Sequence, residues 1–183
     1  MKVQLDFCSD LVAVLIVGLL RIGFIRQRAG CGSGGRRFLA RIEESIVIMA
    51  KPERIWPFLF WDRIPEWLDG IRKARYTSEE KDSVGATAHV IAEMAGIKAE
   101  WDVEITEYVR NERATWRTTG GNLTAVGLTM LESVEAGSKL TFVIDYDLPY
   151  SILGKVVDKL MVSRDVEKGI KTGLRKLKRI VEE

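Results

Sequence analysis

Cysteine and histidine are nearly absent from this 183-residue sequence, which has two cysteines and one histidine. Cys8 and Cys31 both lie in the first 37 residues, so the rest of the chain has no disulfide framework and no cysteine-rich zinc site. His89 is the only histidine, so a metal site with two or more histidine ligands is excluded. A Ser-His-Asp triad would have to use this one histidine as its base. No clustered Asp/Glu spacing suggests a carboxylate site either. We therefore expect no metal site and no cofactor.

A strong charge of one sign is also missing, because 28 lysines and arginines oppose 26 acidic residues. The formal net charge of +2 is unevenly distributed: residues 1–37 hold six basic and two acidic residues, whereas residues 38–183 hold 22 basic and 24 acidic residues. The larger part of the chain is thus slightly acidic, which gives nucleic-acid binding no support. No nucleic-acid partner is expected.

A full-length transmembrane segment is missing as well. The apolar run from Leu11 to Ile25, interrupted by Arg21, would rise only about 22 Å as a helix, short of a hydrocarbon core of roughly 30 Å. A secretory signal fits poorly, because two aspartates precede the run and no A-x-A-like site follows it. Two interpretations stay open: a short or tilted membrane anchor, or an unpacked tail. The arginines after the run would keep the remaining chain cytoplasmic, so we predict a cytoplasmic protein that is membrane-associated only if this segment anchors it.

The glycine-rich stretch 30–35 separates this leader from the rest. It matches G-x-G-x-x-G by letter, but a strand-like pattern follows it instead of the helix that a dinucleotide fingerprint needs. We interpret it as a linker. The predicted organisation is an apolar and basic leader with linker over residues 1–37, then one domain over residues 38–183.

From Phe38 the pattern becomes that of an antiparallel sheet. A first strand of about ten residues is followed by a short helix that opens near Pro52, and by a second short helical piece from Pro65 to Gly70. Turn residues then join six strand candidates without intervening helices, which indicates an antiparallel sheet. These candidates span residues 71–78, 84–94, 98–109, 112–119, 123–134 and 138–147.

Alternation within the strands predicts one apolar face and one solvated face. Trp101, Val103 and Ile105 alternate with acidic residues, and the sequence from Leu140 to Asp147 alternates in the same way. Residues 151–183 instead carry apolar side chains at three- and four-residue spacings, which predicts a long C-terminal helix. Few apolar residues lie between Ser163 and Lys168, so we expect a bend or break there.

Three segments carry a resemblance to a known family: ARIEESIVIMAKPERIWPFLFWDRIPEWLDGI, AEWDVEITEYVRNERATWRTTGG and GSKLTFVIDYDLPYSILGKVVDKL. With this element order, residues 38–183 resemble the START-like superfamily, also called SRPBCC or birch-pollen-allergen-like. Within it they resemble the polyketide cyclase/dehydrase and lipid-transport group. The resemblance implies an α+β helix-grip fold, in which a curved antiparallel sheet wraps around the long helix and leaves an apolar cavity.

The resemblance, together with the inward strand positions, selects candidate ligand-binding residues. Small inward alanines leave space and aromatic residues supply walls, although the same aromatics could simply fill a core. Trp67 is the candidate for the cavity entrance, with plain packing of its ring in the interior as the alternative. The candidates are Trp67, Trp101, Val103, Trp116, Phe142, Ile144, Tyr146, Leu153, Val157 and Met161.

No residue pattern indicates catalysis. His89 falls on the outward parity of its strand, and no paired carboxylates occupy the inward face. Tyr146 could orient a ligand carbonyl or close an internal polar contact. A run of basic residues on the last helix, from Lys168 to Arg179, either complements the helix dipole or meets anionic lipid.

The function expected from these features is binding, and by extension transport, of a hydrophobic small molecule such as a lipid or polyketide in the cavity. Two alternatives stay open. One is a polyketide cyclase/dehydratase-type enzyme whose acid or base would come from Tyr146, His89 or an inward carboxylate that the sequence does not place. The other is a membrane-associated accessory protein, for which the leader and the basic helix are the evidence. The sequence does not predict an oligomeric state.

Overall fold

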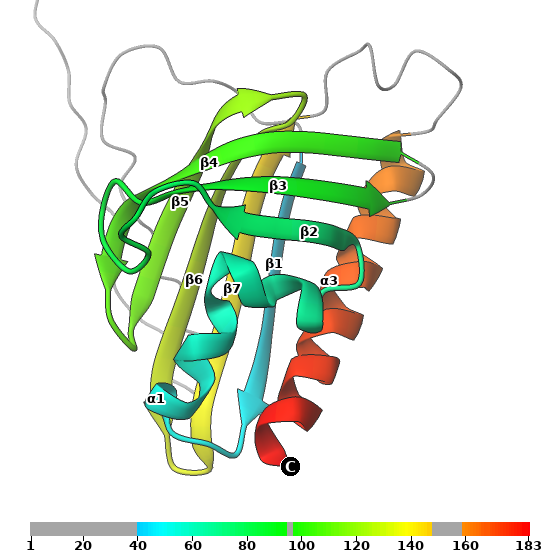
Figure 1. Cartoon of the computed structure of the whole chain (residues 1–183). Coiled ribbons are helices and arrows are strands. Elements are labelled where there is room, and N and C mark those ends of the chain that lie inside the picture. Colours follow the sequence, from blue (N-terminus) through cyan, green and yellow to red (C-terminus); the bar gives the residue numbers. More distant parts are fainter. Residues whose placement is uncertain (1–39, 95–96, 148–158) are drawn as a thin grey trace, which may run out of the picture. The chain divides into compact units, whose positions relative to one another are not determined.

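The computed structural model describes residues 40–94, 97–147 and 159–183, and every structural statement below concerns these residues. A strand comes first, then three short helical turns, six further strands and a long helix (Figure 1). The strands are β1 (Ala40–Ile48), β2 (Ile71–Tyr76), β3 (Thr87–Met94), β4 (Ile97–Val109), β5 (Arg113–Gly121), β6 (Thr124–Val134) and β7 (Gly137–Asp147). The helices are α1 (Pro52–Ile55), the 3-10 helices η1 (Trp56–Leu59) and η2 (Trp61–Glu66), and α3 (Lys159–Glu182).

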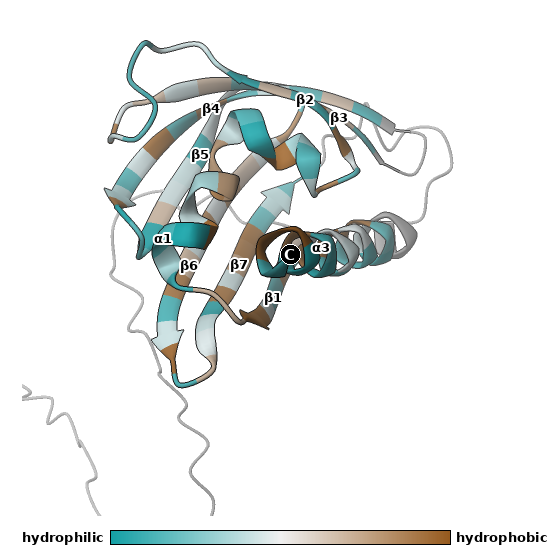
Figure 2. Ribbon diagram, turned by 60° about the horizontal axis from the view of Figure 1, so that its bottom comes forward, coloured by the Kyte–Doolittle hydropathy of each residue, from teal (hydrophilic) through white to brown (hydrophobic). Residues whose placement is uncertain are grey.

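The seven strands form one antiparallel sheet in the order β1-β7-β6-β5-β4-β3-β2. Each strand from β2 to β6 pairs with the next in the chain, and β1 lies against β7 with Ala40 opposite Tyr146. Figure 2 shows the sheet curving around one side, where α3 and the short helices lie. The predicted α+β helix-grip fold is confirmed.

Helix α3 packs an apolar stripe against the concave side of the sheet. Val166, Ile170, Leu174, Leu177 and Val181 recur at three- and four-residue spacings and are all buried, as an amphipathic helix requires. The helix is continuous from Lys159 to Glu182, so of the two expected features between Ser163 and Lys168, a bend or a break, the break is wrong. Val166 carries the buried stripe into that stretch, and Ile170 continues it after Lys168. The predicted start at residue 151 lies outside the described residues.

The second short helix begins earlier than the sequence predicts. Instead of starting at Pro65, η2 runs from Trp61 to Glu66 and carries Pro65 near its end. A 3-10 helix has three residues per turn, so positions three apart share one face. Trp61, Ile64 and Trp67 follow this spacing and are all buried. Burial of that face, more than the proline, sets where the helix lies.

Three register shifts interrupt the pairing of the strands. In β2 the register with β3 shifts between Ile71 and Lys73. In β4 the register with β5 shifts between Asp102 and Val103 and again between Ile105 and Glu107. An extra residue reverses the side-chain alternation beyond it. Strict alternation along the sequence therefore predicts the wrong face for the ends of both strands.

The solvated outer face expected for β7 is also interrupted. Thr141 and Val143, on the parity expected to be wet, are both buried. Strand β7 lies between β1 and β6, so its outward side chains are flanked on both sides by those of neighbouring strands. The alternation therefore fails at these two positions of β7, the second strand from the β1 edge of the sheet, where both faces lose solvent.

Candidate functional site

A cavity of about 380 Å³ lies between the sheet, the short helices and α3. This volume falls within the roughly 300–1,000 Å³ that small-molecule sites usually occupy. Most side chains that line it are apolar or aromatic. The lining residues are Trp56, Leu59, Phe60, Trp61, Ile64, Trp67, Leu68, Asp69, Gly70, Ile71, Tyr76, Trp101, Ile105, Tyr108, Ala114, Trp116, Leu123, Thr129, Phe142, Ile144, Asp165, Val166, Lys168, Gly169, Ile170 and Thr172.

The charged lining residues are all solvent-exposed. Asp69 lies just before β2, and Asp165 and Lys168 lie on α3 with Thr172, which is exposed as well. Asp69 also pairs with Lys176 of α3, with 2.6 Å between the carboxylate Oδ1 and Nζ. The cavity therefore opens to solvent between the segment before β2 and one side of α3, while its interior is apolar.

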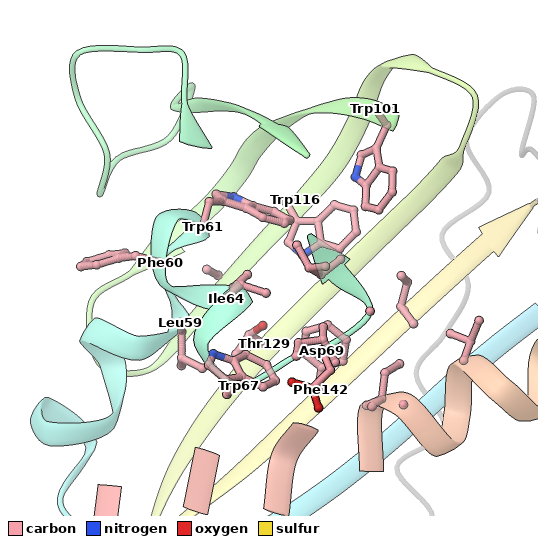
Figure 3. A pocket seen from close by; sticks show the side chains of 18 of the residues that line it. Leu59, Phe60, Trp61, Ile64, Trp67, Asp69, Trp101, Trp116, Thr129 and Phe142 are labelled. Atoms are coloured by element: carbon pink, nitrogen blue, oxygen red, sulfur yellow. The ribbon is translucent and has the colours of Figure 1, made fainter. Parts of the chain in front are cut away.

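Two tryptophans form the inner wall of the cavity, Trp61 from η2 and Trp116 from β5. The rings of Trp61 and Trp116 meet edge to face, with centroids 5.2 Å apart and planes at 75° (Figure 3). Trp116 on β5 lies opposite Gly127 on β6, and a Cβ at Gly127 would overlap the indole ring. The glycine thus gives the ring its place against the sheet. A lone glycine inside a strand signals such a close approach, but the sequence analysis did not single it out.

Five predicted ligand-binding residues come together in the lining: Trp67, Trp101, Trp116, Phe142 and Ile144. Val103 and Tyr146 are buried but do not line the cavity. Leu153 and Val157 lie outside the described residues, as does the side chain of Met161 in α3. Whether these residues bind a ligand stays a prediction.

Trp67 is held in the interior of the protein and not at an exposed entrance. Its side chain is 1% exposed, and its Nε1–H donates a hydrogen bond to the backbone oxygen of Phe58 at 2.8 Å. The expectation of a rim position is therefore wrong, because the 3-10 spacing of η2 turns this ring inward together with Trp61 and Ile64. The entrance is instead marked by Asp69 and its neighbours on α3.

Tyr76 and Tyr108 line the cavity, and sequence reasoning missed both because each follows a β-bulge. Burial raises the pKa of both phenols, so both are neutral hydroxyls at physiological pH. The Tyr108 hydroxyl accepts a hydrogen bond from Trp56 Nε1 at 3.0 Å, and the Tyr76 hydroxyl accepts one from the Trp61 backbone N–H at 3.4 Å. Both tyrosines thus fasten the short helices to the sheet.

The structure also places the two catalytic candidates. Tyr146 bonds to Ser163 on α3, with 2.9 Å between the two oxygens, so its hydroxyl closes an internal contact. His89 lies between two carboxylates, with Nδ1 2.8 Å from Asp102 and Nε2 3.1 Å from Glu100. These partners belong to the solvent-facing parity of β4, away from the cavity. Within the described part of the chain, no group of three or more His, Cys, Asp or Glu residues is placed to hold a metal ion.

The basic run on α3 is partly neutralised by nearby acids. Lys171 pairs with Glu44 and Glu167, Lys176 pairs with Asp69, and Lys178 approaches Glu182. No helix in the described ranges is long and apolar enough to span a membrane. The run from Leu11 to Ile25 lies outside them. Membrane contact and cytoplasmic localisation therefore stay predictions.

A curved antiparallel sheet that holds a C-terminal helix across an apolar cavity defines a START-like protein, and solved structures share this fold. The aromatase/cyclase Zhui from Streptomyces sp. R1128 superposes with a TM-score of 0.65 at 14% identity, over 78% of this chain and 93% of that one. A START superfamily protein from Mycobacterium smegmatis superposes with a TM-score of 0.63 at 13% identity, over 78% of this chain and 97% of that one. Ara h 8.0201 superposes with a TM-score of 0.57 at 16% identity, over 78% of this chain and 97% of that one. At these identities the likeness concerns the fold.

A family model identifies the chain more closely. The model for polyketide cyclase / dehydrase and lipid transport matches residues 40–182, so the chain belongs to that family. A curated relative, an uncharacterized 17.2 kDa protein in the melC2-rnhH intergenic region of Streptomyces lincolnensis, is 24% identical over 147 residues. That match covers 79% of this chain and 91% of the relative.

Proposed function

We propose that this protein binds a hydrophobic small molecule, of lipid or polyketide type, in the cavity between the sheet and α3. The observation that carries the proposal is the cavity itself: a space of about 380 Å³ whose charged lining residues all lie at its exposed mouth. Removing apolar ligand surface from water into such a space is favourable by roughly 25 cal/mol per Å². Membership of a family that includes lipid transport supports the same ligand class.

Binding is favoured over catalysis by where the ionisable groups lie. A cyclase or dehydratase needs a general acid or base within reach of the bound substrate. His89 is held by carboxylates on the other face of the sheet, and Tyr146 is outside the lining. Asp69 and Asp165 line only the exposed mouth of the cavity. The phenols that line the cavity, Tyr76 and Tyr108, have raised pKa values, so they are weak acids and form no phenolate that could act as a base near neutral pH. The likeness to the aromatase/cyclase Zhui therefore carries less weight for this chain than the shape of its cavity.

Binding of the neutral fluorophore N-phenyl-1-naphthylamine tests the proposal. We expect stoichiometric, saturable binding to the wild-type protein, with an emission rise typical of a dry site. Gly169 offers a blocking position, because it lines the cavity and a Cβ there meets no atom within 4 Å. A Gly169→Phe substitution should fill the space and abolish binding without unfolding the domain.

Arg175→Phe is the matched control. It places the same ring on the same helix at an exposed position outside the lining, and it should leave binding unchanged. No saturable uptake by the wild-type protein would overturn the proposal. If the Gly169→Phe protein binds the probe as tightly as the wild type does, the probe binds at a site other than this cavity. Native mass spectrometry of protein purified from its own host would then show which ligand it carries.

A further inference from the structure

One hydroxyl group in the cavity wall has no partner among the described residues. Thr129 on β6 lines the cavity and is 8% exposed. No hydrogen bond joins its hydroxyl to a side chain or backbone group in the described ranges, yet its oxygen is not one of the fully enclosed unpaired atoms, which are Trp101 Nε1 and Thr141 Oγ1. Buried polar groups are almost always paired, so an unpaired hydroxyl on a cavity wall points to a bound molecule.

The strand pairing places this hydroxyl inside the cavity. Thr129 lies opposite Ala114 on β5 and Phe142 on β7, and both of these residues line the cavity as well. Residues directly opposite each other share one face of a sheet. The side chain of Ala114 is a single methyl group, which leaves space beside the hydroxyl. Figure 3 shows Thr129 in the wall to which Phe142 and Trp67 also belong.

Two other inward-facing hydroxyls show the usual arrangement. The Thr118 hydroxyl accepts a hydrogen bond from the backbone N–H of Ala125 at 3.0 Å, and the Tyr146 and Ser163 oxygens lie 2.9 Å apart. Neither Thr118 nor Tyr146 lines the cavity. The fold thus pairs these hydroxyls within the protein, whereas the Thr129 hydroxyl is left for a molecule in the cavity.

The chemistry of the missing partner follows from the hydroxyl and its surroundings. A hydroxyl both donates and accepts, whereas the indole N–H groups of Trp61 and Trp116 in the same lining only donate. Thr129 can therefore pair with a ligand carbonyl by donating, or with a ligand hydroxyl in either role. An anionic group at this depth would lack a counter-ion, because Lys168, the one cation among the described lining residues, is exposed at the mouth.

We infer that Thr129 is a specificity-determining residue whose hydroxyl forms a hydrogen bond with an uncharged oxygen of the bound ligand, in a carbonyl or a hydroxyl group. This inference rests on the binding function proposed above. It narrows the ligand class from hydrophobic molecules in general to neutral molecules that carry an oxygen within their apolar body. The hydrocarbon part of the ligand then lies against the aromatic wall of Trp61, Trp116 and Phe142.

Two pairs of probes with matched shapes test the inference. 2-Acetylnaphthalene is compared with 2-isopropenylnaphthalene, and 1-(2-naphthyl)ethanol with 2-isopropylnaphthalene, so that each pair exchanges one oxygen for one carbon. The affinity ratio of oxygenated probe to hydrocarbon is measured by calorimetry for the wild-type protein and for Thr129→Val. Dividing the two ratios cancels the difference in water solubility within a pair. We expect the wild-type ratio to exceed the variant ratio by about threefold to tenfold for at least one pair, the range of a net hydrogen bond.

Two further variants serve as matched controls. Thr129→Ser keeps the hydroxyl and should keep the wild-type ratio, even if the lost methyl group lowers the affinity for all four probes. Thr141→Val makes the same exchange as Thr129→Val at a buried threonine of β7 that lies outside the lining and whose oxygen is fully enclosed. The ratios of the Thr141→Val protein should equal those of the wild type.

The outcomes separate this inference from the proposed function. If the probes bind but both ratios are the same in wild type and Thr129→Val, Thr129 only packs against the ligand, the inference is overturned and the binding function stands. A ratio that falls for only one pair supports the inference and shows whether the ligand oxygen is a carbonyl or a hydroxyl. If neither these probes nor N-phenyl-1-naphthylamine binds the wild-type protein, the proposed function itself fails.

Discussion

Gly127 lies directly beneath the indole of Trp116, so closely that a Cβ on this glycine would overlap the ring atoms Cε2 and Cζ2. The two residues face each other across β5 and β6. Trp116 in turn meets Trp61 of η2 edge to face. Because Gly127 on β6 has no side chain, the indole of Trp116 on the neighbouring strand can lie close against the sheet. The position of this ring sets how deep the cavity is at β5.

Gly127→Ala should therefore disturb both stability and binding. Overpacking of a filled site costs about 1–3 kcal/mol, and the displaced indole can move only toward Trp61 or into the cavity. We expect a lower free energy of unfolding in urea and weaker uptake of N-phenyl-1-naphthylamine. The double variant Gly127→Ala/Trp116→Phe should recover part of the lost stability, because the smaller ring leaves room for the methyl group. Two losses that simply add would contradict this coupling.

The two glycines of α3 should respond differently to the same change. A Cβ at Gly169 meets nothing within 4 Å, whereas one at Gly173 would lie 2.9 Å from Leu68 Cδ1 and 3.1 Å from the Trp67 carbonyl oxygen. Alanine favours the helix over glycine by about 1 kcal/mol. Gly169→Ala should gain roughly that amount in chemical denaturation. Gly173→Ala should gain little or lose stability, since the backbone beside it must move. Equal gains at both positions would show that Gly173 does not limit the packing of α3.

Much of the fold follows from local patterns in the sequence. Turn residues and alternation predict all seven strands, and the spacing from Ile170 to Val181 predicts the C-terminal helix. The observed boundaries differ from the predicted ones where tertiary packing determines them. An example is η2, whose position is set by burial of Trp61 and Ile64. The candidate site is predicted in part for the same reason. Trp101 and Trp116 obey the period of two, but Tyr76 and Tyr108 follow bulges that no local pattern marks.

Tyr146 should prove to be a structural residue and not a ligand contact. Its hydroxyl lies 2.9 Å from Ser163 Oγ and joins β7 to α3, and its side chain is absent from the cavity lining. Tyr146→Phe and Ser163→Ala should each cost about 0.5–1.5 kcal/mol, and the double variant should cost little more than either. Probe affinity should stay unchanged in all three. A selective loss of probe binding in Tyr146→Phe would instead place the phenol in the binding site.

The buried tyrosines should make the domain sensitive to alkali. Burial raises the pKa of Tyr76 most, with smaller contributions to Tyr108 and Tyr146, whereas an unfolded chain has phenol pKa values near 10. Above about pH 10 the unfolded chain therefore releases protons that the folded protein retains, so stability is complete below that pH and falls as pH rises. Each retained proton lowers the free energy of unfolding by at most about 1.4 kcal/mol per pH unit.

Tyr76→Phe removes the largest contribution to this pH dependence. The stability of the variant, measured by urea denaturation from neutral to strongly alkaline pH, should therefore decline less steeply than that of the wild type. Tyrosinate absorbance of the folded protein should show fewer phenols titrating near pH 10 than the chain contains, and parallel stability curves for the two proteins would contradict the assignment to Tyr76.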